Sequence, residues 1–153
     1  MIAVLGNIAV LTALGAAIAI VVQAIRTRRS GSKRAMRLPV LILLWSGIAA
    51  FVLLEMAILT HDFSIAYVAN NTSLDTPVVF LFAAGWAALE GSIVLWGLVL
   101  AIFTYLVWRR LDEVDGLGVI ALGVMGFVSV FWFGLMATAG NPFAVCTEAV
   151  GNA

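Results

Sequence analysis

Four long apolar stretches constrain this chain more than any other feature of its sequence. They cover approximately residues 2–25, 39–60, 77–108 and 117–139. A helix needs roughly 20 mostly apolar residues to cross the hydrocarbon core of a bilayer, and every stretch meets that length. The chain is 64% hydrophobic and 10% charged, whereas a soluble domain carries about 25% charged residues. We therefore predict an all-α integral membrane bundle of four transmembrane helices, forming a single membrane domain over residues 1–153.

The basic residues predict how this bundle is oriented. All eight Lys and Arg residues lie within 26–37 or at 109–110, in the connections that follow the first and third apolar stretches. Loops on the cytoplasmic side of a membrane collect Lys and Arg. We expect these connections to face the cytoplasm and both termini and the 61–76 loop to face outward (N-out/C-out), in a multi-pass protein of the bacterial inner membrane. The formal net charge of zero argues against nucleic acid as a partner.

The third apolar stretch is too long for one straight span. A helix over 77–108 would be about 48 Å long, against a hydrocarbon core of roughly 30 Å. We expect its outer part, 77–88, to tilt, bend or lie along the interface. Gly85 and Gly91 are the candidate positions for a bend.

Glu90 is the least expected residue of this stretch, because a charge at the bilayer centre costs at least about 2.5–3.5 kcal/mol. Acids inside a membrane face a bundle interior, a partner or a water-filled cavity. On an unbroken helix, Trp86, Glu90 and Gly97 would share one face. The structural alternative is a protonated Glu90 hydrogen-bonded to a neighbouring helix. If the helix bends outside the core, Glu90 lies near the outer interface instead.

Glu55, in the second stretch, raises the same question, with an interfacial, snorkelling acid as the structural alternative. Glu55 and Glu90 together suggest a small proton- or ion-coupled membrane transport subunit as one possible function. His61 is the only histidine, and its spacing to Cys146 resembles no metal site. Spacing alone therefore predicts no catalytic set, no metal site and no cofactor-binding residues.

Three segments resemble a known family in order and spacing: "DFSIAYVAN" (62–70), "WAALEGSIVLW" (86–96) and "NPF" (141–143). They are similar to the N-terminal part of the CcmF family, the membrane haem lyases of cytochrome c-type biogenesis (system I). Two positions depart from the family pattern, since Leu89 replaces a histidine and Ala87 replaces a glycine. The resemblance implies a functional motif composed of Asp62, Tyr67, Asn70, Trp86, Glu90, Gly91, Ser92 and Trp96.

The resemblance also implies a function in cytochrome c maturation, haem transport and cytochrome complex assembly. Its partners would be the remaining lyase helices or a C-terminal lyase subunit, a haem chaperone and apocytochrome c, on the outer face of the membrane. Haem is the implied cofactor, although the family's tryptophan-rich haem-ligand segment does not occur in this sequence. We expect a truncated or split lyase subunit that is not catalytic alone. In it, Glu90 is expected to orient the outer loop through hydrogen bonds to Tyr67 or Asn70.

Overall fold

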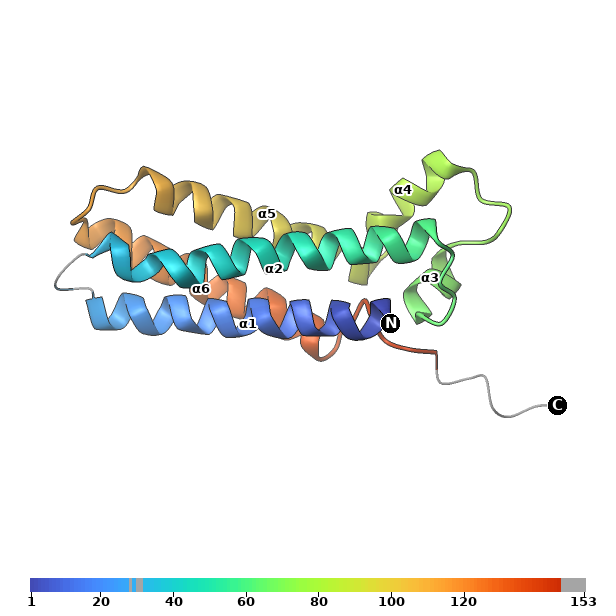
Figure 1. Ribbon diagram of the computed structural model, residues 1–153, viewed down its shortest axis with the longest axis horizontal. Coiled ribbons are helices and arrows are strands. Elements are labelled where there is room, and N and C mark those ends of the chain that lie inside the picture. The colour runs from blue at the N-terminus through green and yellow to red at the C-terminus, as the bar shows by residue number, and fades with distance from the viewer. Residues whose placement is uncertain (28, 30–31, 147–153) are drawn as a thin grey trace.

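A computed structural model describes residues 1–27, 29 and 32–146, and the described residues form six helices joined by short connections (Figure 1). The helices are α1 (Ile2–Thr27), α2 (Lys33–Leu59), α3 (Ala66–Asn71), α4 (Val78–Ala87), α5 (Leu89–Arg110) and α6 (Gly116–Ala137). Of these, α1, α2, α5 and α6 are long and apolar enough to cross a membrane. The prediction of an all-α membrane bundle with four spanning helices is therefore confirmed.

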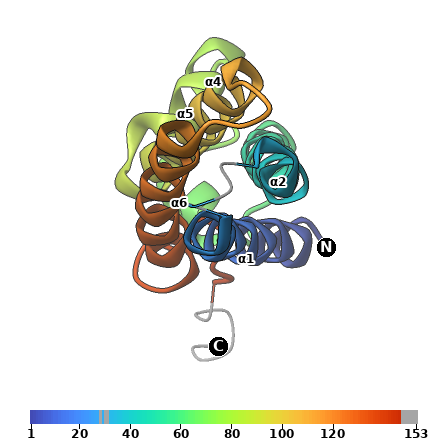
Figure 2. The same ribbon diagram turned by 90° about the vertical axis from the view of Figure 1, so that its left-hand side faces the viewer.

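The four long helices pack as a ring. Helix α1 lies against α2 and α6, and α5 lies against α2 and α6 on the other side (Figure 2). Small residues allow the close approach of α1 and α6, since a Cβ on Gly123 or Gly126 would meet Ala24 or Ile20. Such small residues are typical of contacts between membrane helices, where packing rather than water exclusion holds helices together.

Both basic connections lie at one end of the ring, which we call the basic end (residues 29, 32–37 and 109–115; Figure 1). The Lys33 backbone N–H donates to the Glu113 carbonyl at 3.2 Å, and Ser32 forms an isolated β-bridge with Val114. The opposite end, the motif end, contains the N-terminus, residues 61–77 and residues 138–146. The prediction that the two basic connections share one end is confirmed, whereas the side of the membrane that each end faces stays a prediction.

The second helix begins earlier than expected. It starts at Lys33 rather than at Pro39, so Pro39 lies inside α2 instead of in its opening turn. The reason is a tertiary contact: besides its backbone bond, Lys33 donates its ammonium to the Leu111 carbonyl at 2.6 Å. These bonds anchor an additional first turn, and membrane helices tolerate an interior proline when neighbouring groups satisfy the freed backbone.

The stretch 77–108 is not one helix but is divided into α4 and α5, and its outer part departs from a straight span as expected. The chain is extended at Ala88 (φ −118°, ψ 173°), which ends α4 and precedes α5. The break therefore lies between the two glycines that were expected to bend the helix. Helix α5, with 22 residues, is about 33 Å long and close to a bilayer core of roughly 30 Å, whereas α4, with ten residues, is too short to span it.

The segment after α6 closes the ring at the motif end. Phe143 is 0% exposed and lies so close to Gly6 of α1 that a Cβ there would overlap its ring. The Asn141 amide donates to the side-chain oxygen of Asn7 at 3.0 Å. The Asn141 side-chain oxygen accepts from the Phe143 N–H at 2.9 Å. The first and last described segments are thus held together by one aromatic side chain and an amide pair.

Phe143→Ala is expected to lower the free energy of unfolding by about 3–5 kcal/mol, because it leaves a cavity against α1. The measurement is unfolding in mixed micelles titrated with a denaturing detergent, followed by circular dichroism. Phe131→Ala is the matched control, since Phe131 is 63% exposed and its loss should change stability by less than about 0.5 kcal/mol. Equal effects of the two substitutions would contradict the closing role of Phe143.

Candidate functional site

The candidate site is built around the break at Ala88. Because α4 ends at Ala87, the Ala84 carbonyl no longer has the usual helical donor four residues later. The Tyr67 hydroxyl, from α3, donates to this carbonyl at 2.6 Å and is itself buried. A freed backbone acceptor is thereby satisfied by a side chain from the loop, as a buried carbonyl requires.

Gly91 makes room for this contact. A Cβ at Gly91 would overlap both the Tyr67 hydroxyl and the Gly85 carbonyl oxygen. The absence of a side chain at this position therefore lets α3 and the end of α4 meet the first turn of α5. Of the motif residues expected from the sequence, Gly91 thus has a clear steric role.

A polar cavity of about 250 Å³ lies beside this junction. Its polar lining consists of Tyr67, Asn70 and Asn71 from α3, Glu90 from α5, and Thr138 and Asn141 from the segment after α6. The three sequence motifs therefore each contribute residues to the lining of this cavity. The cavity offers a carboxylate, three side-chain amides and two hydroxyls, a set suited to hydrogen-bonding a polar group.

The position of Glu90 answers why an apolar stretch carries a carboxylate. Glu90 lies in the first turn of α5, at the motif end, and lines the cavity with a partly exposed side chain. A negative charge in the first turn of a helix is favourable, by roughly 0.3–1 kcal/mol at exposed sites. The cost estimated for the centre of a bilayer therefore does not apply, and the shared face expected for Trp86 and Glu90 is lost at the break.

The expected hydrogen bonds from Tyr67 or Asn70 to Glu90 are not formed. Tyr67 donates to Ala84 instead, and among the described residues the Glu90 carboxylate has no side-chain hydrogen bond. Glu90 acts on Tyr67 through its charge. Burial raises the pKa of Tyr67 above its ordinary value of 10.0, the backbone at Ala88 opposes the rise, and the nearby charge of Glu90 adds to it. The hydroxyl therefore stays protonated at neutral pH and able to donate.

Glu55 lies deeper in the same region. It is 9% exposed, and its carboxylate lies against Gly85, where a Cβ would overlap it. Neither carboxylate oxygen has a hydrogen-bond partner in the structure. This burial argues against a snorkelling carboxylate, while the depth of Glu55 in the membrane stays a prediction. Because an unpaired charge is costly in such an environment, the neutral form is favoured there.

The remaining motif residues lie outside the cavity. Asp62 accepts from the backbone N–H and the hydroxyl of Ser64, which shapes the turn before α3. Ser92 donates to the Leu89 carbonyl in the first turn of α5. Trp86 and Trp96 are 46% and 59% exposed. The exposed rings are suited to contacts with lipid or with another protein, rather than with the cavity.

His61 has an unusual conformation at the end of α2. Its φ of 51° lies in the left-handed region, and its ring lies 5.8 Å from that of Phe63. The Nε2 atom is buried without a hydrogen-bond partner. Within residues 1–27, 29 and 32–146, no group of three His, Cys, Asp or Glu side chains is placed to hold a metal ion.

Asn7 is the residue that the sequence analysis missed. Its amide donates to the Ala3 carbonyl at 2.9 Å and to the Phe143 carbonyl at 3.4 Å, and its oxygen accepts from Asn141. The available signal was an asparagine in the otherwise apolar stretch 2–11 of α1, since a polar side chain there needs a partner. The helix thereby fixes the position of Asn141 in the cavity wall.

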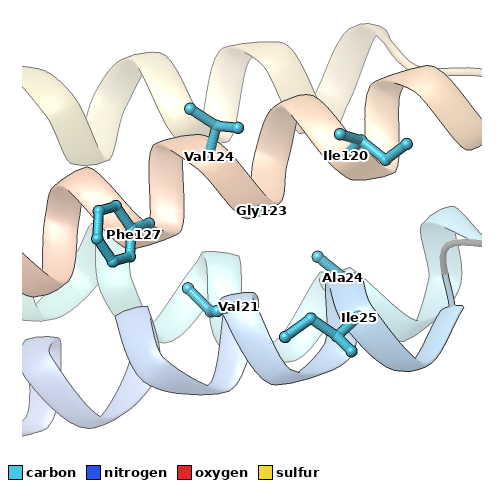
Figure 3. Close-up of a pocket in the computed structure, with 7 residues that line it drawn as sticks. All are labelled: Val21, Ala24, Ile25, Ile120, Gly123, Val124 and Phe127. Carbon is cyan, nitrogen blue, oxygen red and sulfur yellow. The ribbon is translucent and has the colours of Figure 1, made fainter.

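A second hollow, of about 380 Å³, lies between α1 and α6 (Figure 3). Its lining side chains come from Val21, Ala24, Ile25, Ile120, Val124 and Phe127, with Gly123 between them. All of these side chains are hydrocarbon. This hollow therefore offers no side chain for acid–base chemistry or for ligating a metal.

Gly91→Ala is expected to destabilise the chain by about 1–3 kcal/mol, because the new methyl group forces Tyr67 away from Ala84. Gly134→Ala is the matched control, since a Cβ at Gly134 meets nothing within 4 Å. The same unfolding titration compares them. Adding Tyr67→Phe to Gly91→Ala should recover part of the loss, as a double-mutant cycle would show. A cycle without coupling would argue against the steric role of Gly91.

The chain was compared with known proteins, and no protein-family model matches it. A cytochrome c-type biogenesis protein CcmF from Escherichia coli (strain K12) is 34% identical over 145 residues, covering 92% of this chain and 22% of that protein. The CcmF protein of Pseudomonas fluorescens is 42% identical over 98 residues, covering 62% of this chain and 14% of that protein. The chain therefore spans less than a quarter of the length of either relative.

The fold agrees with these relatives. A solved structure named "Cytochrome c Heme Lyase CcmF" is 38% identical, with a TM-score of 0.87, and the match covers 97% of this chain and 26% of that one. The resemblance inferred from the three motifs is thus confirmed by independent comparisons of sequence and structure. The chain belongs to the CcmF family of cytochrome c-type biogenesis proteins, and it corresponds to about a quarter of the length of the solved family member.

Proposed function

We propose that this chain forms part of a membrane haem lyase, which attaches haem to apocytochrome c during cytochrome c maturation. The observation that supports this most directly is the match to a solved haem lyase over 97% of the chain. No observation favours the alternative of a proton- or ion-coupled transport subunit. The relatives that cover this chain are described as cytochrome c-type biogenesis proteins.

Within that lyase, the role of this chain is to hold the polar residues of the motif end in a fixed arrangement. The break at Ala88 and the Tyr67 hydrogen bond hold α3 against the end of α4, beside the first turn of α5, so that Asn70 and Glu90 present polar groups in one cavity. Glu90 would orient the loop or a docked partner through its charge. We infer this positioning role for Glu90 and Asn70 because both side chains lack hydrogen bonds within the described chain.

Haem is the substrate of the proposed lyase, and the cavity does not suit direct binding of its iron. Axial ligands to haem iron are His, Cys, Met or Tyr side chains. Of these, the cavity lining contains only Tyr67, whose hydroxyl is committed to the Ala84 carbonyl. Iron ligation is therefore assigned to other parts of the lyase, and this chain is proposed to act as a scaffold.

The partners would be the other lyase helices, a haem chaperone and apocytochrome c, at the bacterial inner membrane. Exposed apolar side chains on α4 and α5, such as Phe80, Trp86 and Trp96, offer a surface for those helices. The motif end would face outward, which is the side where apocytochrome c is expected.

A chimera tests the lyase proposal. The corresponding region of the Escherichia coli CcmF would be replaced by this chain in a strain lacking its own CcmF. Haem covalently attached to cytochrome c would then be measured by haem staining of denaturing gels. The chimera is expected to restore maturation, and Glu90→Gln to reduce it at least about fivefold, the equivalent of roughly 1 kcal/mol. Asp112→Asn, at the basic end, is the matched control. A chimera that accumulates in the membrane and yields no cytochrome c would refute the proposal.

Reporter fusions test the orientation. Alkaline phosphatase is expected to be active when fused after Thr72 and inactive when fused after Asp112, because the basic connections should stay in the cytoplasm. A fluorescent protein that folds only in the cytoplasm should give the opposite pattern at both positions. Phosphatase activity at Asp112 but not at Thr72 would reverse the orientation and place the cavity on the wrong side for the proposed partners.

A further inference from the structure

The basic end contains a second polar pocket, remote from the motif end. It has a volume of about 380 Å³ and lies between the first turn of α2 and the last turn of α5, at the end viewed in Figure 2. Its lining residues are Lys33, Arg34, Arg37, Trp108 and Glu113. Three cations therefore share this pocket with one carboxylate, which leaves it with an excess of positive charge.

Two of its side chains are fixed in place by the fold. The Lys33 ammonium donates to the Leu111 carbonyl at 2.6 Å and to the Arg109 carbonyl at 3.3 Å, and it lies 5.6 Å from the centre of the Trp108 ring. The Trp108 indole N–H donates to the Lys33 carbonyl at 3.2 Å. The wall formed by these two residues is therefore preorganised.

The two arginines have their donors free. Within the part of the chain that the structure describes, the guanidinium groups of Arg34 and Arg37 make no ion pair and no hydrogen bond, and the Glu113 carboxylate is likewise unpaired. Both arginines are exposed and stand one turn apart on α2. A planar guanidinium is matched to the oxygens of a phosphate, to which it donates two parallel bonds.

The position of the pocket along the spanning helices indicates which molecule would supply that phosphate. Lys33 begins one helix that is long and apolar enough to span a membrane, and Trp108 lies in the last turn of another, so the pocket is expected near the boundary of the hydrocarbon core. Tryptophan is enriched at this boundary. We propose that this pocket binds the phosphate of an anionic phospholipid headgroup. Arg34 and Arg37 hold the phosphate, and the acyl chains extend along the spanning helices.

The test compares lipid retention by the full chain, purified in a mild detergent and analysed by native mass spectrometry. The probes are phosphatidylglycerol, phosphatidylcholine and inorganic phosphate. Phosphatidylglycerol should bind in preference to phosphatidylcholine. Arg34→Gln/Arg37→Gln should weaken its binding about tenfold or more, because each cation near the headgroups contributes to anionic lipid affinity.

The matched control is Arg26→Gln/Arg110→Gln, which removes two exposed charges from the ends of other spanning helices and leaves the pocket intact. It should retain phosphatidylglycerol to within about twofold of the unmodified chain, because neither Arg26 nor Arg110 lines the pocket in which the phosphate is held. Arg34→Lys/Arg37→Lys keeps the charge and removes the planar donors. It should weaken binding by an intermediate amount, and it decides the question if the glutamine variant fails to fold.

Three results would overturn the proposal. The first is an equal loss of phosphatidylglycerol in the pocket and control variants, which would indicate general electrostatic attraction. The second is unchanged retention in both arginine variants of the pocket. The third is thermal stabilisation by inorganic phosphate equal to that by phosphatidylglycerol at the same concentration, which would indicate a free-phosphate site. None of these results bears on haem attachment, so the lipid proposal and the lyase proposal are tested separately.

Discussion

The hydrogen bond from the Tyr67 hydroxyl to the Ala84 carbonyl joins α3 to the end of α4, and the candidate site depends on it. It satisfies a backbone acceptor that becomes free because the chain is extended at Ala88. Without that break, α4 would continue into α5 as one helix longer than the bilayer core. With it, Glu90 begins a new helix and lies beside Asn70 and Asn141 in a polar cavity. The cavity is thus a consequence of where one helix stops.

The spanning helices were predictable because length and hydropathy decide whether a segment crosses a bilayer. For the break at Ala88, the sequence could predict that the stretch departs from a straight helix but not where. The excess length of the third stretch required some departure from a straight helix, but its position depends on contacts that arise after folding. Gly91 does not bend the chain. Its missing side chain leaves room for the Tyr67 hydroxyl and the Gly85 carbonyl. The extended residue is Ala88, which lies between Gly85 and Gly91 in the sequence.

The candidate site shows the same division. Tyr67, Asn70 and Glu90 line one cavity, but Tyr67 bonds to Ala84 instead of Glu90. The role of Asn7 could not be assigned from the sequence, because two of its partners, Phe143 and Asn141, lie more than 130 residues away. The burial of Glu55 could not be predicted for a different reason. Its burial depends on the missing side chain of Gly85, on a helix that follows it in the chain.

The closure between Asn7 and the 141–143 segment fixes an order of assembly. The ribosome synthesises α1 before α6, and the contacts of α1 with Asn141 and Phe143 cannot form until α6 has left the translocon. During that interval the Gly6 face of α1 has no Phe143 to cover it. Closure of the ring therefore follows the synthesis of all four of its helices, and a chain that ends before Pro142 would lack the contacts that close it.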